Sequence, residues 1–282
     1  MSFTSEHTLL RDNVRAFAER EIAPNVNAWD ETQTFPRELY ARASALGLLD
    51  LGYPQTYGGT PCDGWFKLIA TEETARARSG GLMASWFSHN IGLPPINAHG
   101  SDELKCSDTA HLRFDNCRVP IENLIGEENQ GFRVVMENFN GERLLMSAGA
   151  CTFAQVCFDE ALAWARERKT FGVALARHQV LRHKLMDMRM RIASTRDWLH
   201  ALVEQQERGD TGPEWVAKLC LLKNHATQAM QWCADAAVHI LGGMGFMRGV
   251  KSERIYREVK VMMIGGGTED IMKELAARQL GV

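Results

Sequence analysis

The chain has 282 residues, 45% of them hydrophobic, and 32 basic residues against 35 acidic ones give a net charge of −3. This length is enough for one large domain or two ordinary domains, each with a substantial core. The balanced charge, without a basic stripe, argues against a nucleic-acid partner. The first residues lack the basic-then-apolar pattern of a secretory signal, and no apolar run approaches about 18 residues, so we expect no membrane span.

Seven cysteines are scattered along the chain without a Cys-x-x-Cys pair, and the nine histidines form no metal-spaced group. An odd number of dispersed cysteines is typical of reduced thiols rather than of a disulfide framework or a zinc site. We therefore expect a cytoplasmic protein without a metal.

The first hundred residues predict helices. Apolar residues between Leu9 and Phe17 recur on one stripe, which predicts a helix over 5–22, with Ser5 as its N-cap. Further helices are expected over 36–47 and 64–78, and the pair Gly80-Gly81 should end the second of these. We assign residues 1–105 to an N-terminal helical domain.

Residues 106–130 have a different pattern. Alternation in His111-Leu112-Arg113-Phe114 predicts a strand near 110–119. A single strand cannot satisfy its own backbone groups, so its isolation indicates that the rest of its sheet is absent from the chain. We interpret 106–130 as the remnant of a β-domain followed by a linker.

Long amphipathic helices are expected from Gly131 onward. Leu181, Leu185, Met188 and Ile192 recur on one helical face, and a second long helix should run over 213–241. Helices of this length need neighbours along their sides, which favours a four-helix-type bundle and a homo-oligomer. The domain would cover 131–282, and the fold class would be mainly α.

Several short motifs occur in a fixed order along the chain: Val119-Pro120-Ile121-Glu122-Asn123-Leu124-Ile125-Gly126, Glu142-Arg143, Glu167-Arg168-x-x-Phe171-Gly172, Leu241-Gly242-Gly243-x-Gly245 and Ile264-Gly265-Gly266-Gly267-Thr268. As an ordered set they resemble the flavin-dependent acyl-CoA dehydrogenases, and the resemblance covers nearly all of the chain. It implies a helical domain, a middle β-domain and a C-terminal four-helix bundle. It also implies removal of a proton from the carbon alpha to a thioester and transfer of a hydride from the beta carbon to FAD.

This sequence departs from the family in its middle. The segments that cradle the flavin ring in the family are missing, and the chain passes from Lys105 to Cys106 directly into the last strand of that domain. About 100 residues are absent, which is a normal size for a domain.

The resemblance assigns Glu142 as the catalytic base, because Gly266 occupies the family's other base position and has no side chain. A carboxylate in a dry pocket has a raised pKa, which suits proton abstraction. We expect Asn140 to open a long helix, Glu142 to face an enclosed cavity beside the bends at 242–243 and 265–267, and Asn140 and Arg143 to lie beside the acyl chain. The alternative is that Glu142 and Arg143 are a solvated pair at a helix start.

The resemblance also implies a set of FAD-binding residues, some of which usually act across a subunit interface. They are Arg168, Lys169, Thr170, Gln179, His239, Ile240, Leu241, Gly242, Gly243 and Thr268. Each has a plainer alternative, namely basic residues at a helix C-terminus, a glycine helix stop, or an ordinary N-cap.

The leading interpretation is an acyl-CoA dehydrogenase with FAD as cofactor, an acyl-CoA substrate and electron-transfer flavoprotein or another electron acceptor as partner, assembled as a dimer or tetramer. Two alternatives stay open from the sequence. One is a catalytically inactive or engineered helical scaffold that oligomerises through the bundle. The other is a minimal bundle that binds CoA thioesters without oxidising them.

Overall fold

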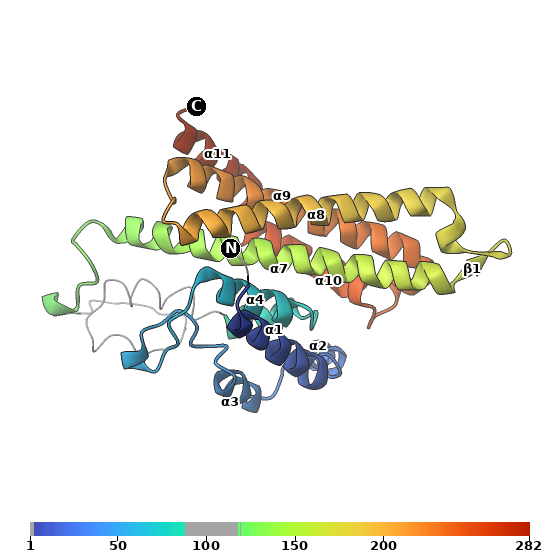
Figure 1. The fold of residues 1–282 in the computed structure, drawn as a ribbon, viewed down its shortest axis with the longest axis horizontal. Helices are drawn as coiled ribbons and strands as arrows, with labels where there is room; N and C mark the ends of the chain where they lie inside the picture. The colour runs from blue at the N-terminus through green and yellow to red at the C-terminus, as the bar shows by residue number, and fades with distance from the viewer. Residues whose placement is uncertain (1–2, 88–117, 119) are drawn as a thin grey trace.

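A computed structural model describes residues 3–87, 118 and 120–282 of the chain. Figure 1 shows three long helices, α7, α8 and α9, side by side in an elongated bundle, with a smaller group of N-terminal helices packed against α7. Only two strands, of two residues each, occur in the described part of the chain. The mainly α fold class is therefore confirmed. The strand expected near 110–119 falls, apart from Arg118, outside the described residues.

The helices are α1 Ser5–Phe17, α2 Val26–Thr32, α3 Glu38–Ala45, α4 Gly64–Ala75, α5 Gly80–Trp86, α7 Gly131–Glu167, α8 Gln179–Glu207, α9 Pro213–Leu241, α10 Lys251–Ile264 and α11 Glu269–Leu280. The strands β1 Lys169–Thr170 and β2 Val173–Ala174 pair antiparallel as a hairpin between α7 and α8. Among the helices of the described ranges, none has both the length and the apolar character that crossing a bilayer requires.

The first helix begins one residue earlier than expected. Thr4, not Ser5, is its N-cap, and its Oγ1 accepts a hydrogen bond of 3.3 Å from the backbone N of His7. Leu9 was expected on the buried stripe, but it is 62% exposed. The buried face is formed by His7, Val14 and Phe17, and Leu9 lies about 200° around the helix from His7, so it points to solvent.

The pair Gly80-Gly81 opens a helix instead of ending one. The chain turns at Arg78, which has a φ of +69°, and Ser79 then caps α5 by accepting from the backbone N of Leu82 at 3.2 Å. A Cβ at Gly80 would lie 2.8 Å from a carboxylate oxygen of Glu258, so a larger residue there would make this side chain shift. The backbone N–H of Gly80 donates a hydrogen bond to that oxygen at 3.2 Å.

Helices α7 and α9, which pack against each other in the bundle, run in the same direction. Near their first halves Leu144 shares a buried cluster with Leu222, and near their ends Ala161 shares another with Ala237. The predicted stripe on α8 is confirmed at Leu185, Met188 and Ile192, which are all buried. Small residues at many of the buried positions of α7 and α9 let the two backbones approach closely.

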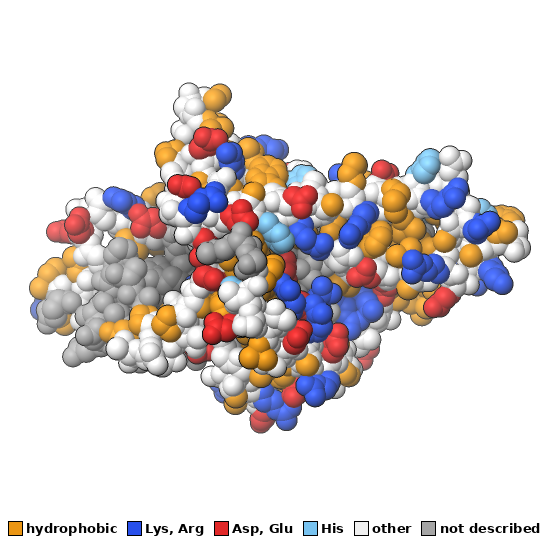
Figure 2. All heavy atoms as spheres, in the orientation of Figure 1, with side chains coloured by type: hydrophobic (Ala, Val, Ile, Leu, Met, Phe, Trp, Pro, Cys, Tyr) orange, Lys and Arg blue, Asp and Glu red, His pale blue; other side chains and the backbone are white. Residues whose placement is uncertain are grey.

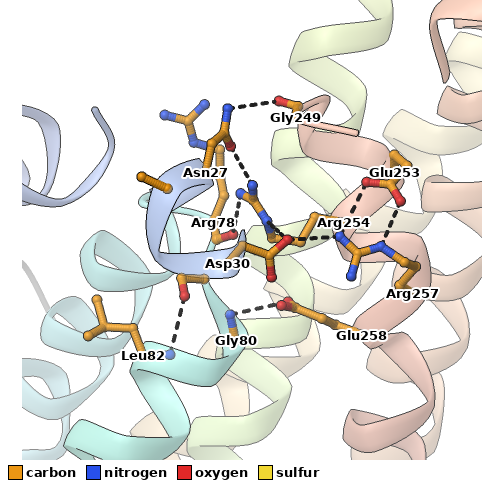
Figure 3. A network of polar contacts seen from close by, with 12 residues as sticks. Asn27, Asp30, Arg78, Gly80, Leu82, Gly249, Glu253, Arg254, Arg257 and Glu258 are labelled. Carbon is orange, nitrogen blue, oxygen red and sulfur yellow. Dashed lines mark hydrogen bonds and ion pairs between the residues drawn. The ribbon is translucent and has the colours of Figure 1, made fainter. Parts of the chain in front are cut away.

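A buried arginine joins the N-terminal helices to the bundle (Figure 3). Arg254 on α10 is 3% exposed, and its guanidinium donates to the side-chain oxygen of Asn27 and, at 3.4 Å, to the carbonyl oxygen of Arg78. Asp30 lies 3.5 Å from Nε of Arg254 and 3.0 Å from the guanidinium of Arg257. The contact fixes α2 and the start of α5 against α10.

Replacing Arg254 with Met should lower the free energy of unfolding by about 3 kcal/mol, because it leaves partly buried acceptors without their donor. Arg278→Met is the matched control, since among the residues that the structure describes Arg278 pairs only with the exposed Glu274 on the surface of α11. That change should cost less than about 1 kcal/mol. Urea unfolding of both variants measures the difference, and equal destabilisation would contradict the role given to Arg254.

Candidate active site

Glu142 lies well inside α7 rather than at its beginning. The helix starts at Gly131, so the expectation that Asn140 opens it was wrong. Gly141 weakens a helix by about 1 kcal/mol. Burial of the following apolar residues, beginning with Leu144, outweighs that penalty and carries the helix through this point.

The carboxylate of Glu142 is half-buried on the side of α7. Nδ2 of Asn138, one turn earlier, donates to its Oε1 at 2.8 Å. Burial raises the pKa of Glu142 to about 7, although the hydrogen bond from Asn138 and the charge of Arg143 act in the opposite direction. Near neutral pH the carboxylate and the carboxylic acid are therefore comparably populated, which is the condition that favours a general base.

Arg143 is buried and holds a backbone bend. It is 4% exposed, and its Nε donates to the carbonyl oxygen of Gly266 at 3.0 Å. Its Nη1 donates to Oδ1 of Asn140 at 3.1 Å. Arg143 thus connects α7 to the bend between α10 and α11, and the alternative of a solvated helix-start pair is wrong for this residue. The contact of Asn140 and Arg143 with an acyl chain stays a prediction.

Lys223 is a site residue that the sequence reasoning missed. It is fully buried on α9, and its Nζ donates to the carbonyl oxygens of Met263 at 2.8 Å and Gly267 at 2.7 Å. Burial lowers the pKa of Lys223 to about 8. A lysine between the buried Leu222 and Ala226 on an apolar helix stripe was the available signal, because a charge in such a place needs specific partners.

A side chain at Gly266 would be strained and would press on Met146. Its φ is +67°, and a Cβ would lie 2.9 Å from Sδ of Met146 and 3.7 Å from Cγ of Arg143. A carboxylate at this position, the alternative base position in the family, would have to displace Met146 and adopt a left-handed backbone. The geometry therefore agrees with Glu142 as the base candidate on this side of the bundle.

The two glycine-rich bends do not meet beside Glu142. The bend at 265–267 touches Arg143 and Lys223, but Leu241, which precedes the other bend, is 18 residues beyond Lys223 on a continuous helix. At 1.5 Å per residue that separation is about 27 Å. The expectation of one cavity flanked by both bends was therefore wrong, because α9 carries its C-terminus away from this site.

The predicted flavin-contact residues around 168–179 gather at the far end of the bundle (Figure 1). Arg168 follows the last residue of α7 and is about 39 Å along that helix from Glu142. In the hairpin, Oγ1 of Thr170 lies 3.2 Å from Nε2 of His178, which precedes Gln179. Arg168 and Lys169 are exposed, and within the described residues neither has an ion-pair partner.

The segment 239–243 contains both exposed and buried side chains. His239 is exposed at the end of α9, whereas Ile240 and Leu241 are only 4% and 6% exposed and belong to the core. Because their side chains are buried, those two residues can contact a ligand only through their backbone. Gly242 has a φ of +62° and open space around it, as has Gly243, so this end of α9 can admit a ligand closely.

Thr268 is exposed at the start of α11, and its side chain makes no capping hydrogen bond. The alternative that it is an ordinary side-chain N-cap therefore lacks its defining contact. Within 3–87 and 120–282, no group of three or more His, Cys, Asp or Glu side chains is arranged to hold a metal ion.

These donors fit the phosphate end of a dinucleotide. Two exposed cations and the hydroxyl of Thr170 lie together at the hairpin, and a guanidinium suits the geometry of phosphate oxygens. The resemblance places the residues that hold the ring in a segment that this chain lacks, so the fit concerns the pyrophosphate and adenosine part of FAD.

Family models and similar known proteins all indicate the same protein family. The model described as acyl-CoA dehydrogenase, C-terminal domain, matches residues 129–281, and that described as acyl-CoA dehydrogenase, N-terminal domain, matches 4–107. The mitochondrial short-chain specific acyl-CoA dehydrogenase of Rattus norvegicus is 33% identical over 376 aligned positions, which cover 97% of this chain and 90% of that protein. Since this chain has 282 residues, at least 94 of those positions have no counterpart here.

Solved structures show the same fold. The structure of an acyl-CoA dehydrogenase from Mycobacterium smegmatis has a TM-score of 0.90 and 30% identity, covering 99% of this chain and 98% of that one. The structure of PigA with FAD and proline also has a TM-score of 0.90, at 16% identity and with 100% and 99% coverage. The latter likeness concerns the fold alone.

The raised pKa of Glu142 predicts a stability effect that needs no cofactor. Between its ordinary pKa of about 4.3 and the folded value of about 7, the folded state keeps a proton that the unfolded state has released, so folding stability falls as pH rises through 7. Glu142→Gln removes this titration. Its stability relative to the parent chain should therefore increase by about 2 kcal/mol between pH 5 and pH 8, after allowance for solvent screening.

Urea unfolding at the two pH values measures the change. The control is Glu137→Gln, five residues earlier on α7, where the side chain is exposed and paired with Arg133 at 2.9 Å. A pH-independent difference for Glu142→Gln would refute the desolvated environment.

Proposed function

Since the chain belongs to the acyl-CoA dehydrogenase family, we propose that it converts an acyl-CoA thioester to the 2-enoyl-CoA, with Glu142 as the base. The observation that carries the proposal is the half-buried carboxylate of Glu142 with its pKa raised to about 7. The alternative loop position, Gly266, has no side chain, and one placed there would be strained and would displace Met146.

Glu142 would remove the proton from the carbon alpha to the thioester carbonyl. The hydrogen bond from Asn138 to Oε1 orients the carboxylate and leaves Oε2 as the atom that takes the proton. A carboxylate that is already partly desolvated gains a proton at little cost near neutral pH, which lowers the barrier for abstraction. Arg143 and Lys223 act indirectly, because they fix the bend at 265–267 against α7.

FAD is the cofactor of this family, and when bound it accepts the hydride from the beta carbon. In this chain, Arg168, Lys169 and Thr170 would hold its pyrophosphate, with Gln179 beside them. The backbone of 239–243 would meet the adenosine part of that FAD. Thr268, which follows the bend at 265–267, would offer its hydroxyl to the FAD bound on the Glu142 side. The exposed, unpaired cations of the hairpin support this assignment.

We propose a homo-oligomer, a dimer or tetramer, in which each site uses two subunits. Glu142 and Arg168 of one chain are about 39 Å apart along α7, so they cannot serve one active site within that chain. The hairpin end also exposes apolar side chains, with Phe171 98% and Val180 70% accessible. Such side chains are typical of a surface that another subunit covers.

The cellular setting and the electron acceptor follow from the same family assignment. The described cysteines are all free, and four of the five are buried, which is compatible with the reducing cytoplasm. Electron-transfer flavoprotein would then take the electrons from the reduced flavin. A protein that binds no FAD would instead support the helical-scaffold alternative.

Glu142→Gln should slow anaerobic bleaching of the flavin by an acyl-CoA by a factor of about 10²–10⁴, because it removes the base and keeps the shape. For the parent protein the bleaching rate should rise with pH and level off above about 7, as the carboxylate becomes deprotonated. Stopped-flow absorbance measures both effects. Unchanged bleaching in the variant would rule out Glu142, and a parent protein without bleaching would rule out the oxidation itself.

Arg168→Gln should weaken FAD binding about tenfold, since it deletes one charge-assisted contact to phosphate. Arg208→Gln, which changes an exposed arginine paired with Asp210 at the other end of α8, should leave the affinity unchanged. Quenching of flavin fluorescence on titration measures the two dissociation constants. Equal affinity in both variants would place the pyrophosphate elsewhere.

A further inference from the structure

A cleft with a volume of about 460 Å³ lies where α1 and α4 meet α7 and α8. Figure 2 shows basic and acidic side chains gathered on this face, along the line where the N-terminal helices reach the long ones. Gln155 marks its position on α7, 13 residues from both Glu142 and Arg168, or about 20 Å from each along the helix. The cleft is therefore separate from the proposed active site and from the hairpin.

Three arginines of the cleft surround one buried carboxylate. Glu73 is 2% exposed, and Arg15 donates to its two oxygens at 2.9 and 2.7 Å. Nε of Arg76 lies 3.0 Å from the same carboxylate, and Nε of Arg11 lies 4.0 Å away. Glu73 is thus fully paired with arginines. Together these four side chains keep an excess of positive charge.

Two further arginines, from α8, reach the side chain of Gln155 on α7 in the same cleft. Arg189 and Arg196 donate to Oε1 of Gln155 at 3.3 and 3.4 Å, while Nε2 of Gln155 donates to Asp159 at 2.8 Å. Within the described part of the chain, neither Arg189 nor Arg196 is in an ion pair. Of the residues lining the cleft, five are arginines and three are carboxylates.

The third carboxylate of the cleft, Glu72, compensates this excess of positive charge only weakly. Burial raises its pKa, although the nearby charge of Arg196 acts the other way. An incoming anion would favour the neutral acid further, and a neutral carboxyl can donate a hydrogen bond to that anion. At the rim, the ring of Phe3 is 43% exposed, and the guanidinium carbon of Arg11 lies 4.6 Å from its centroid.

We propose that this arginine cleft binds a phosphate ester of nucleotide size, with Arg189 and Arg196 on the phosphates and Phe3 against the flat base. Phosphate suits the arrangement because it presents oxygens in three dimensions to guanidiniums from two turns of one helix, whereas a carboxylate accepts within one plane. The volume falls in the range of small-molecule sites and exceeds what inorganic phosphate needs. The flat, exposed ring offers stacking that a simple anion would not use.

Isothermal titration of the full chain with ADP, pyrophosphate and adenosine at low salt tests the proposal. ADP should bind saturably, pyrophosphate more weakly, and adenosine not measurably. Arg189→Gln changes an exposed residue of the cleft and should weaken ADP binding about tenfold. Arg208→Gln, at the end of the same helix and outside the cleft, should bind ADP as the parent does.

The proposed flavin site must be separated from this one, because ADP is also part of FAD. The ADP titration is therefore repeated in the Arg168→Gln background, where the hairpin site is already weakened. A saturable site that Arg189→Gln weakens about tenfold should remain in this background. Loss of all saturable ADP binding in the Arg168→Gln background would overturn the proposal, as would equal weakening by Arg189→Gln and Arg208→Gln. Absence of saturable binding of both ADP and pyrophosphate would overturn it as well. None of these outcomes depends on whether Glu142 acts as a base.

Discussion

Two buried cations hold one backbone bend, and the geometry around Glu142 depends on this contact. Arg143 and Lys223 come from different long helices, yet both donate to carbonyl oxygens of 263–267. Removing a guanidinium and an ammonium from water is costly, and carbonyl hydrogen bonds offset that cost only while the bend keeps its shape. The bend, α7 and α9 are therefore fixed together, and Glu142, next to Arg143 in sequence, takes its orientation from that unit.

Regular features of the fold were predictable because they follow from local pattern. The apolar spacing on α8 gave its buried face at Leu185 and Ile192, and the length of the 213–241 pattern gave α9. Local pattern failed where the deciding contact is distant in sequence. Gly80 looks like a helix breaker, but Glu258, far along the chain, makes it the first residue of a helix.

The candidate site likewise has features that local pattern could predict and features that depend on contacts distant in sequence. Motif order alone nominated Glu142 as the base candidate, since that choice needs only a carboxylate and an empty Gly266. It could not reveal Lys223, whose two acceptors lie 40 and 44 residues away, nor show that the bend at 242–243 lies far from Glu142. The second fact depends on α7 and α9 running in the same direction, which the periodicity of neither helix encodes.

The length of α7 has a genetic consequence. Under the proposed two-subunit site, Glu142 at one end of the helix and Arg168 after its other end would belong to two different centres of an oligomer. An allele altered at Glu142 and an allele altered at Arg168 would each have low activity alone. In a mixed assembly one centre would receive both intact halves, so co-expression would restore part of the turnover, an interallelic complementation that a self-contained site would never show.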